Sequence, residues 1–119
     1  MNHKDLDVWK ESMVLVTQIY QVTNHFPKSE VYGLTSQMRR CAVSIPSNIA
    51  EGSGRNGFKE LHRFIGIAMG SASELETQVL IAIQLEFIEK EAAELLELQI
   101  ESVKKLLVGY KNYVKRRLE

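Results

Sequence analysis

Residues 57–88 read GFKELHRFIGIAMGSASELETQVLIAIQLEFI. The apolar residues in this stretch recur at steps of three and four, which is the period of an α-helix. The two-residue alternation that is typical of a half-buried strand is not sustained here or elsewhere in the chain. A continuous helix over this range would be about 45 Å long, at about 1.5 Å per residue. The stretch therefore predicts an all-α protein built from long helices.

Two further helices are predicted before this stretch. The first covers residues 7–25, and Pro27 ends it because proline disfavours helical geometry at the residue before it. The second covers residues 34–51 and contains Pro46, which removes one backbone donor and clashes with the preceding turn. We expect a kink at Pro46 rather than two shorter helices, because the apolar and polar spacings continue across it.

A fourth helix is predicted over residues 90–117. Its apolar seam alternates steps of four and three, as in long helices that cross at a shallow angle, and consists of Leu96, Ile100, Val103, Leu107, Tyr110 and Val114. Four amphipathic helices with short connections predict an antiparallel, up-down four-helix bundle that forms a single domain over residues 1–119. The alternative is a long helical hairpin that completes its core only in an oligomer.

The helix expected over residues 57–88 has more apolar surface than one bundle seam can bury. Its apolar residues cover well over one face, whereas an amphipathic surface helix needs an apolar stripe of roughly 100°. Burial on two sides follows, and we expect another subunit of the same chain on the second side. A central, well-covered helix within the monomer is the alternative.

Net charge limits the functional classes. Lys and Arg number 15, as do Asp and Glu, so the formal net charge is zero, unlike that of a strongly basic nucleic-acid coat protein. The charges are nevertheless segregated. Residues 74–101 hold eight acids and one base, whereas residues 104–119 hold six bases and one acid. These C-terminal bases either oppose the helix dipole or form an interaction tail for RNA or an acidic neighbour.

The expected location is the cytoplasm. The chain has one cysteine, which agrees with a reducing compartment and excludes an internal disulfide. The N-terminus MNHKDLDVWKES has charges where a signal peptide needs an apolar stretch. No uncharged run approaches the roughly 20 residues of a membrane span. We therefore expect no membrane partner.

Residues 52–57, GSGRNG, match the G-x-G-x-x-G fingerprint of dinucleotide-binding proteins. That fingerprint must follow a strand and begin a βαβ unit, but a helix precedes it here and no strands follow. We interpret its glycines as stopping one helix and supplying the turn to the next. The amides of the next helix, with Arg55 and Lys59 beside them, are a candidate site for a phosphate or sulfate.

Catalysis has no support in the sequence. The three histidines lack a histidine partner at helical spacing, no Glu-x-x-His motif occurs, and no nucleophile lies in an elbow context. Cys41 is adjacent in sequence to Arg40 and close to Arg39, a setting that lowers a thiol pKa, although a small structural residue is the favoured interpretation. We expect no catalytic residue, no metal, no cofactor and no small-molecule substrate.

A polar stripe follows one face of the second helix. Its members are spaced by three or four residues and are Gln37, Arg40, Ser44, Asn48, Glu51 and Arg55. Ser71 and Glu74 lie on a similar line of the third helix. The stripe is either a solvated face or a closely packed one with internal hydrogen bonds.

Ion pairs between the second and third helices are also predicted. If the hairpin turns near residue 55, antiparallel packing places Arg39 or Arg40 near Glu74. The same register places Glu51 near Arg63. Two arginine–carboxylate pairs would then join the helices.

Three segments of the chain form a recognisable pattern: DLDVWKESM (5–13), FPKSEVYGLTSQMRRCAVSIPSNIAEGSGR (26–55) and FIGIAMGSASELETQ (64–78). They closely resemble the 23S ribosomal-RNA intervening-sequence proteins, a family also called four-helix bundle proteins. It implies an up-down bundle that assembles as a ring-like homopentamer. A related branch, the accessory variability proteins of diversity-generating retroelements, binds nucleic acid and a reverse transcriptase.

The family signature is carried over residue by residue and contains no catalytic residue. It covers Gln37, Arg39, Arg40, Ser44, Asn48, Glu51, Gly52, Arg55, Ser71 and Glu74. The nucleic-acid-binding branch is conspicuously basic, whereas this chain is neutral. The resemblance therefore implies self-association, with RNA or a nucleoprotein as a possible partner.

The functional expectation is weak, electrostatic RNA binding by a homo-oligomer. The candidate contacts are the C-terminal bases and two residues at the glycine-rich turn: Lys104, Lys105, Lys111, Lys115, Arg116, Arg117, Arg55 and Lys59. Only Tyr110 and Tyr113 lie among these bases, so aromatic platforms for single strands are expected to be scarce. The alternative is a scaffold that binds a protein partner and no nucleic acid.

Overall fold

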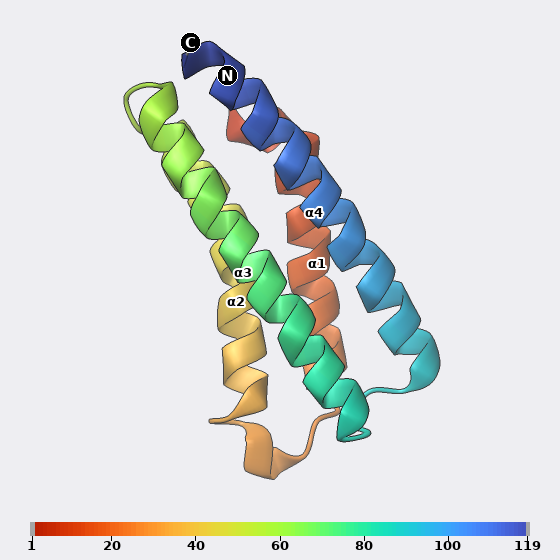
Figure 1. Ribbon diagram of the computed structural model, residues 1–119. Helices are drawn as coiled ribbons and strands as arrows, with labels where there is room; N and C mark the ends of the chain where they lie inside the picture. Colours follow the sequence, from red (N-terminus) through yellow and green to blue (C-terminus); the bar gives the residue numbers. More distant parts are fainter. Residues whose placement is uncertain (1, 119) are drawn as a thin grey trace.

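The computed structural model describes residues 2–118, so the two end residues of the expected 1–119 domain lie outside the described part. The four long helices are α1 Asp7–Thr23, α2 Leu34–Ser53, α3 Phe58–Gln84 and α4 Lys90–Leu118, and two short 3-10 helices are η1 His3–Asp5 and η2 Lys28–Glu30. No strand occurs within residues 2–118. The long helices pack side by side (Figure 1), which confirms the all-α four-helix bundle.

Consecutive helices run in opposite directions along a bundle that measures 47 × 24 × 21 Å (Figure 1). Each helix packs against two others: α2 contacts α1 and α3, and α4 contacts α3 and α1. The turn between α2 and α3 therefore lies at the same end of the bundle as both chain termini (Figure 1). Among residues 2–118, no helix is long and apolar enough to cross a membrane.

One contiguous apolar core runs through the bundle and receives side chains from all four helices. Leu15 and Ile19 of α1, Ile49 of α2 and Leu75 of α3 are among its fully buried members. The expected α4 seam is buried too, except that Tyr110 is only partly covered. Four helices complete this core within one chain. The alternative of a long helical hairpin that completes its core only in an oligomer is therefore wrong.

The α3 helix ends at Gln84, four residues before the predicted end, because the chain reverses at Glu86. Glu86 has a φ of 62°, in the left-handed region. The amide of Phe87 donates to the Ala82 carbonyl and that of Glu86 to the Ile83 carbonyl, the two bonds of a Schellman cap. This reversal returns Phe87 to the bundle, where its ring packs 5.5 Å from that of Phe26.

The α2 helix continues to Ser53, so the prediction that Gly52 stops it is wrong. Gly52 is buried, and a Cβ at this position would lie 2.9 Å from the Cβ of Phe64. Close approach of α3 therefore requires this glycine, and Gly57, with φ of 92°, supplies the turn. Pro46 lies inside one continuous helix, so the alternative of two shorter helices is wrong and the kink remains a prediction.

Candidate nucleic-acid interface at the turn between α2 and α3

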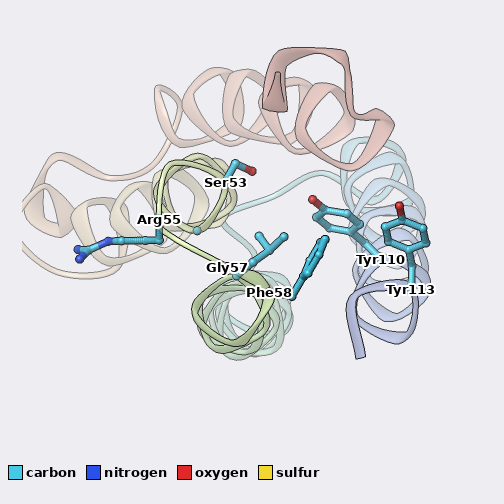
Figure 2. A pocket seen from close by; sticks show the side chains of 8 residues that line it. Ser53, Arg55, Gly57, Phe58, Tyr110 and Tyr113 are labelled. Carbon is cyan, nitrogen blue, oxygen red and sulfur yellow. The ribbon is translucent and has the colours of Figure 1, made fainter. Parts of the chain in front are cut away.

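A cavity of about 380 Å³ opens where the C-terminal part of α4 passes the turn between α2 and α3 (Figure 2). Antiparallel packing creates it, because the end of α4 lies beside the start of α3. Three helices and the turn supply its walls, which are Gly52, Ser53, Arg55, Gly57, Phe58, Leu61, Tyr110 and Tyr113. The fold thus brings the glycine-rich segment to the C-terminal bases, two regions more than 50 residues apart in sequence.

Aromatic side chains dominate the walls of this cavity. The rings of Tyr110 and Tyr113 are stacked, with centroids 6.3 Å apart and planes inclined by 14°. Phe58 faces the same cavity from the first turn of α3 (Figure 2) and is 43% exposed. The prediction of scarce aromatic platforms is therefore wrong at this end of the bundle. It missed Phe58, although Phe58 directly precedes the candidate base Lys59 in the sequence.

Two hydroxyl groups lie on the side of the cavity next to α2. Burial raises the pKa of the Tyr110 phenol; the nearby Ser53 hydroxyl opposes this shift, and Tyr113 adds to it. Tyr110 is therefore neutral at physiological pH and keeps an O–H donor. The Ser53 hydroxyl donates to the Ile49 carbonyl at 2.9 Å, so its oxygen is left to accept.

Most of the candidate basic residues lie at the same end of the bundle as this cavity (Figure 1). The guanidinium of Arg117 lies 4.3 Å from the centroid of the Tyr113 ring, and Lys59 is exposed at the start of α3. The Lys111 side chain reaches α3, where its Nζ approaches Gly66. Lys115 and Arg116 are exposed in the last turns of α4 at the same end of the bundle (Figure 1).

The neighbouring carboxylates are held by local partners. Glu51 accepts from Arg55 at 2.9 Å, and Glu60 accepts from Arg63 at 3.0 Å, each within one helical segment. The acid-rich residues 86–97 lie at the opposite end, around the connection between α3 and α4 (Figure 1). A chain with zero net charge thus has a basic end and an acidic end.

Lys104 and Lys105 lie nearer the middle of α4, away from this basic end. The Nζ of Lys104 is 3.0 Å from Glu76 of α3, and the Nζ of Lys105 is 3.3 Å from Glu101. Both ammonium groups therefore already face a carboxylate. The structure separates these two candidate contacts from the other six, of which Arg55 also pairs with a carboxylate, that of Glu51.

The polar stripe on α2 is packed at its centre and solvated at its ends. The Ser44 and Ser71 hydroxyls are 2.8 Å apart, and the Asn48 amide donates to the Ser44 carbonyl at 2.8 Å and to its hydroxyl at 3.0 Å. These three residues are half-buried. The outer members are exposed, namely Gln37, Arg40, Glu51, Arg55 and Glu74. The interpretation as a closely packed face with internal hydrogen bonds therefore holds for the centre of the stripe, and the interpretation as a solvated face holds for its ends.

The predicted pairing of Arg39 with Glu74 is wrong. Arg39 turns to α1 instead, where its Nε donates to the Thr23 hydroxyl at 2.9 Å and Nη2 to the Asn24 side chain at 3.1 Å. Its guanidinium also lies 4.5 Å from the Tyr20 ring centroid. Arg39 therefore joins α2 to α1, not to α3.

The predicted pair of Glu51 with Arg63 is also wrong, because Glu51 pairs with Arg55, just beyond the end of α2, and Arg63 pairs with Glu60 on α3. Arg40 and Glu74 do line one polar groove of about 460 Å³, together with Ser44 and Ser71. No ion pair within residues 2–118 joins them. Glu74 instead lies 3.5 Å from the Gln78 amide.

Cys41 lies at the edge of the same groove and is partly buried. Burial raises the pKa of its thiol, and the Glu74 carboxylate raises it further; together they outweigh the opposing effects of Gln78 and Arg40. Arg40 does lower this pKa, as its position in the sequence suggested, but the effects of burial and of Glu74 are larger. The thiol is protonated at neutral pH.

Comparisons with known proteins agree with this architecture. The profile of the 23S rRNA-intervening sequence protein family matches residues 4–109. A crystal structure of a protein of unknown function from the S23 ribosomal protein family of Bacteroides thetaiotaomicron is similar in fold. Its TM-score is 0.83 at 21% sequence identity, and the match covers 94% of this chain and 99% of that one. The search of curated proteins finds no match.

Proposed function

Because this chain belongs to the 23S rRNA-intervening sequence protein family, we propose that it is a non-enzymatic, self-associating bundle that binds RNA weakly through its basic end. The observation that carries the proposal is that basic residues from α4 and from the turn between α2 and α3 lie at the end of the bundle where one cavity with three aromatic side chains opens. The cytoplasm is the compartment that agrees with one unpaired cysteine.

The binding energy in this proposal comes from phosphate contacts. Each phosphate neutralised by a Lys or Arg releases condensed counterions, so log K falls with log salt by about 0.7 per contact for a single strand. The free bases in one protomer, such as Lys59, Lys115 and Arg116, are few and exposed. Affinity per protomer is therefore low, and a homo-oligomer raises it when one RNA reaches several subunits.

Self-association is supported by apolar surface that stays uncovered in the monomer. Four apolar side chains of α3 are 40–48% exposed, namely Phe58, Ile67, Leu80 and Ile81, and Leu85, just after the helix, is 53% exposed. The alternative of a central, well-covered helix agrees with the rest of α3, whose other apolar side chains are buried or partly buried. A second copy of the chain is the proposed cover, and a ring of five is the assembly that the family resemblance implies.

The second candidate is a scaffold that binds a protein and no RNA. The zero net charge favours it, as does the polar groove of about 460 Å³ along the α2 stripe. That groove has both an arginine and a glutamate on its walls, Arg40 and Glu74. Mixed charge of this kind suits a protein surface better than a phosphate backbone.

A titration of single-stranded and structured RNA at two salt concentrations tests the proposal. Charge reversal by Lys115→Glu with Arg116→Glu should weaken binding and flatten the salt dependence, because both exposed bases belong to the basic end. Lys105→Glu is the matched control, since Lys105 already faces Glu101. Absence of binding at low salt, or equal losses in both variants, would contradict the proposal.

A further inference from the structure

We propose that the cavity between Phe58, Tyr110 and Tyr113 accepts one unstacked nucleobase of a single-stranded RNA. This inference rests on the proposed RNA binding and adds a base contact to its phosphate contacts. The basic end then binds both parts of a nucleotide, with the nucleobase ring in the cavity and the phosphates on the surrounding Lys and Arg side chains.

The size and walls of the cavity suit a planar ring. At about 380 Å³ it falls within the usual range of roughly 300–1,000 Å³ for small-ligand sites. Apolar and aromatic side chains from two helices face it, and Phe58 lies opposite the two tyrosines (Figure 2). Aromatic faces of this kind bind bases of every type, because each base has a π-face.

The exposure of the aromatic rings argues against a purely structural role. Phe58 is 43% exposed and Tyr113 is 36% exposed, and neither belongs to the contiguous apolar core. A Phe whose only task was packing would gain more from burial, by about 1.5–3 kcal/mol for a full side chain. The open space in front of Gly57, where nothing lies within 4 Å of a built Cβ, keeps the entrance clear.

The polar atoms at the cavity complement a base edge. The Tyr110 phenol offers a donor within reach of the Ser53 hydroxyl, and the Ser53 oxygen offers an acceptor because its own proton is used on Ile49, so the edge of a nucleobase would take the place of their mutual contact. Bases present both donors and acceptors on their edges. One donor and one acceptor orient a base without selecting one base strongly.

The charges around the cavity complement the flanking phosphates. None of the eight residues that line it is acidic. Arg55 is one of them, although its guanidinium pairs with Glu51 and extends away from the tyrosines (Figure 2). The Arg117 guanidinium lies over the outer tyrosine, and Lys59 follows Phe58 at the start of α3. A strand that leaves the cavity therefore has cationic side chains at the same end of the bundle.

The test uses a ten-residue oligouridine with one central 2-aminopurine, whose fluorescence falls when the base stacks on an aromatic ring. The full chain is titrated at low salt, and affinity is measured in parallel by anisotropy. Phe58→Leu and Tyr113→Leu remove a ring but keep an apolar side chain. Tyr32→Leu is the matched control, because Tyr32 is 94% exposed and lies outside this cavity.

We expect quenching with the unmodified chain and the Tyr32 control. Stacking contributes roughly 1–3 kcal/mol per base, so each cavity variant should bind about 5- to 150-fold more weakly. A second measurement needs no variant: an oligomer of the same length and charge with abasic residues should bind more weakly by a similar factor. Circular dichroism checks that the variants remain helical.

Three outcomes are distinguishable. Loss of affinity and quenching in the cavity variants, with weak abasic binding, supports the base site. Equal affinity for the abasic and base-containing oligomers, with no quenching, overturns the base site and leaves electrostatic RNA binding in place. No binding of either oligomer at low salt overturns both proposals and favours the protein scaffold.

Discussion

The hydroxyl oxygens of Ser44 and Ser71 lie 2.8 Å apart and join α2 to α3 near the middle of their contact. Asn48 donates to the same Ser44 hydroxyl, so three short polar side chains form one half-buried network. Small residues allow the two helices to approach closely here, as Gly52 does about two turns later. The centre of the α2 stripe therefore has a structural role in the hairpin.

The serine contact predicts a measurable coupling energy. Ser44→Ala or Ser71→Ala should each cost about 0.5–1.5 kcal/mol, because each leaves the other hydroxyl without its partner. The double variant should cost less than the sum of the two single changes. Urea unfolding of all four chains measures this difference. Strict additivity would show that the two hydroxyls contribute independently.

Gly52→Ala should destabilise the protein because the new Cβ would lie 2.9 Å from the Phe64 Cβ and 3.1 Å from the Leu61 Cδ1. Overpacking of this kind costs about 1–3 kcal/mol. Gly70→Ala is the matched control, since a Cβ there meets nothing within 4 Å and alanine favours a helix interior by about 0.5–1 kcal/mol. Thermal unfolding should move in opposite directions, and equal shifts would contradict the packing argument.

Glu86 occupies the left-handed position of the α3 cap, with φ of 62°. Glycine adopts this conformation without the Cβ penalty of roughly 1–2 kcal/mol. Glu86→Gly should therefore stabilise the protein, by about 1 kcal/mol once the larger entropy of unfolded glycine is included. Thr77→Gly, at an exposed position inside α3, should instead destabilise it by a similar amount. Urea midpoints of both variants check this, and a loss of stability for Glu86→Gly would contradict the role of the cap.

Cys41 should react slowly with iodoacetamide at pH 8, because burial and Glu74 raise the pKa of its thiol. Glu74→Gln should lower that pKa and increase the rate. The sign for stability follows from the same shift. The folded state binds the thiol proton more tightly than the unfolded state does. The contribution of Cys41 to the free energy of unfolding is therefore complete below the unfolded pKa of about 8.5 and is lost as pH rises through the folded pKa. A rate unchanged by Glu74→Gln would show that the carboxylate has no influence.

Sequence periodicity was sufficient for the helices and the core but not for the ends of helices or the partners of charged residues. The α4 seam, from Leu96 to Val114, was predicted because burial on one face repeats every three or four residues. The end of α3 was not predicted, because nothing in the sequence indicates that Glu86 adopts the left-handed conformation. Cross-helix pairing failed for Glu51 because Arg55, one turn away, is closer than any residue of α3.

The basic end was predicted only in part. Its Lys and Arg residues were identified from their clustering in the sequence. The cavity was not predicted, because it depends on which helix ends lie next to each other. Phe58 faces Tyr110 across about 50 residues of chain only when α3 and α4 pack antiparallel. A register argument between these two helices, like the one used for α2 and α3, would have found it.

Self-association gives the final prediction, because its interface on α3 is specific. The unmodified chain should be larger than 13.6 kDa in light scattering across a micromolar dilution series. Ile81→Glu should shift the equilibrium towards monomer, since Ile81 is 42% exposed on the uncovered face of α3 and a buried, unpaired carboxylate is costly. Leu98→Glu is the matched control: Leu98 is an exposed apolar residue of α4, outside the proposed α3 interface, so the same charge should leave the assembly intact. Dissociation by Leu98→Glu but not Ile81→Glu would move the interface to α4, and a stable 13.6 kDa species of the unmodified chain would refute self-association itself.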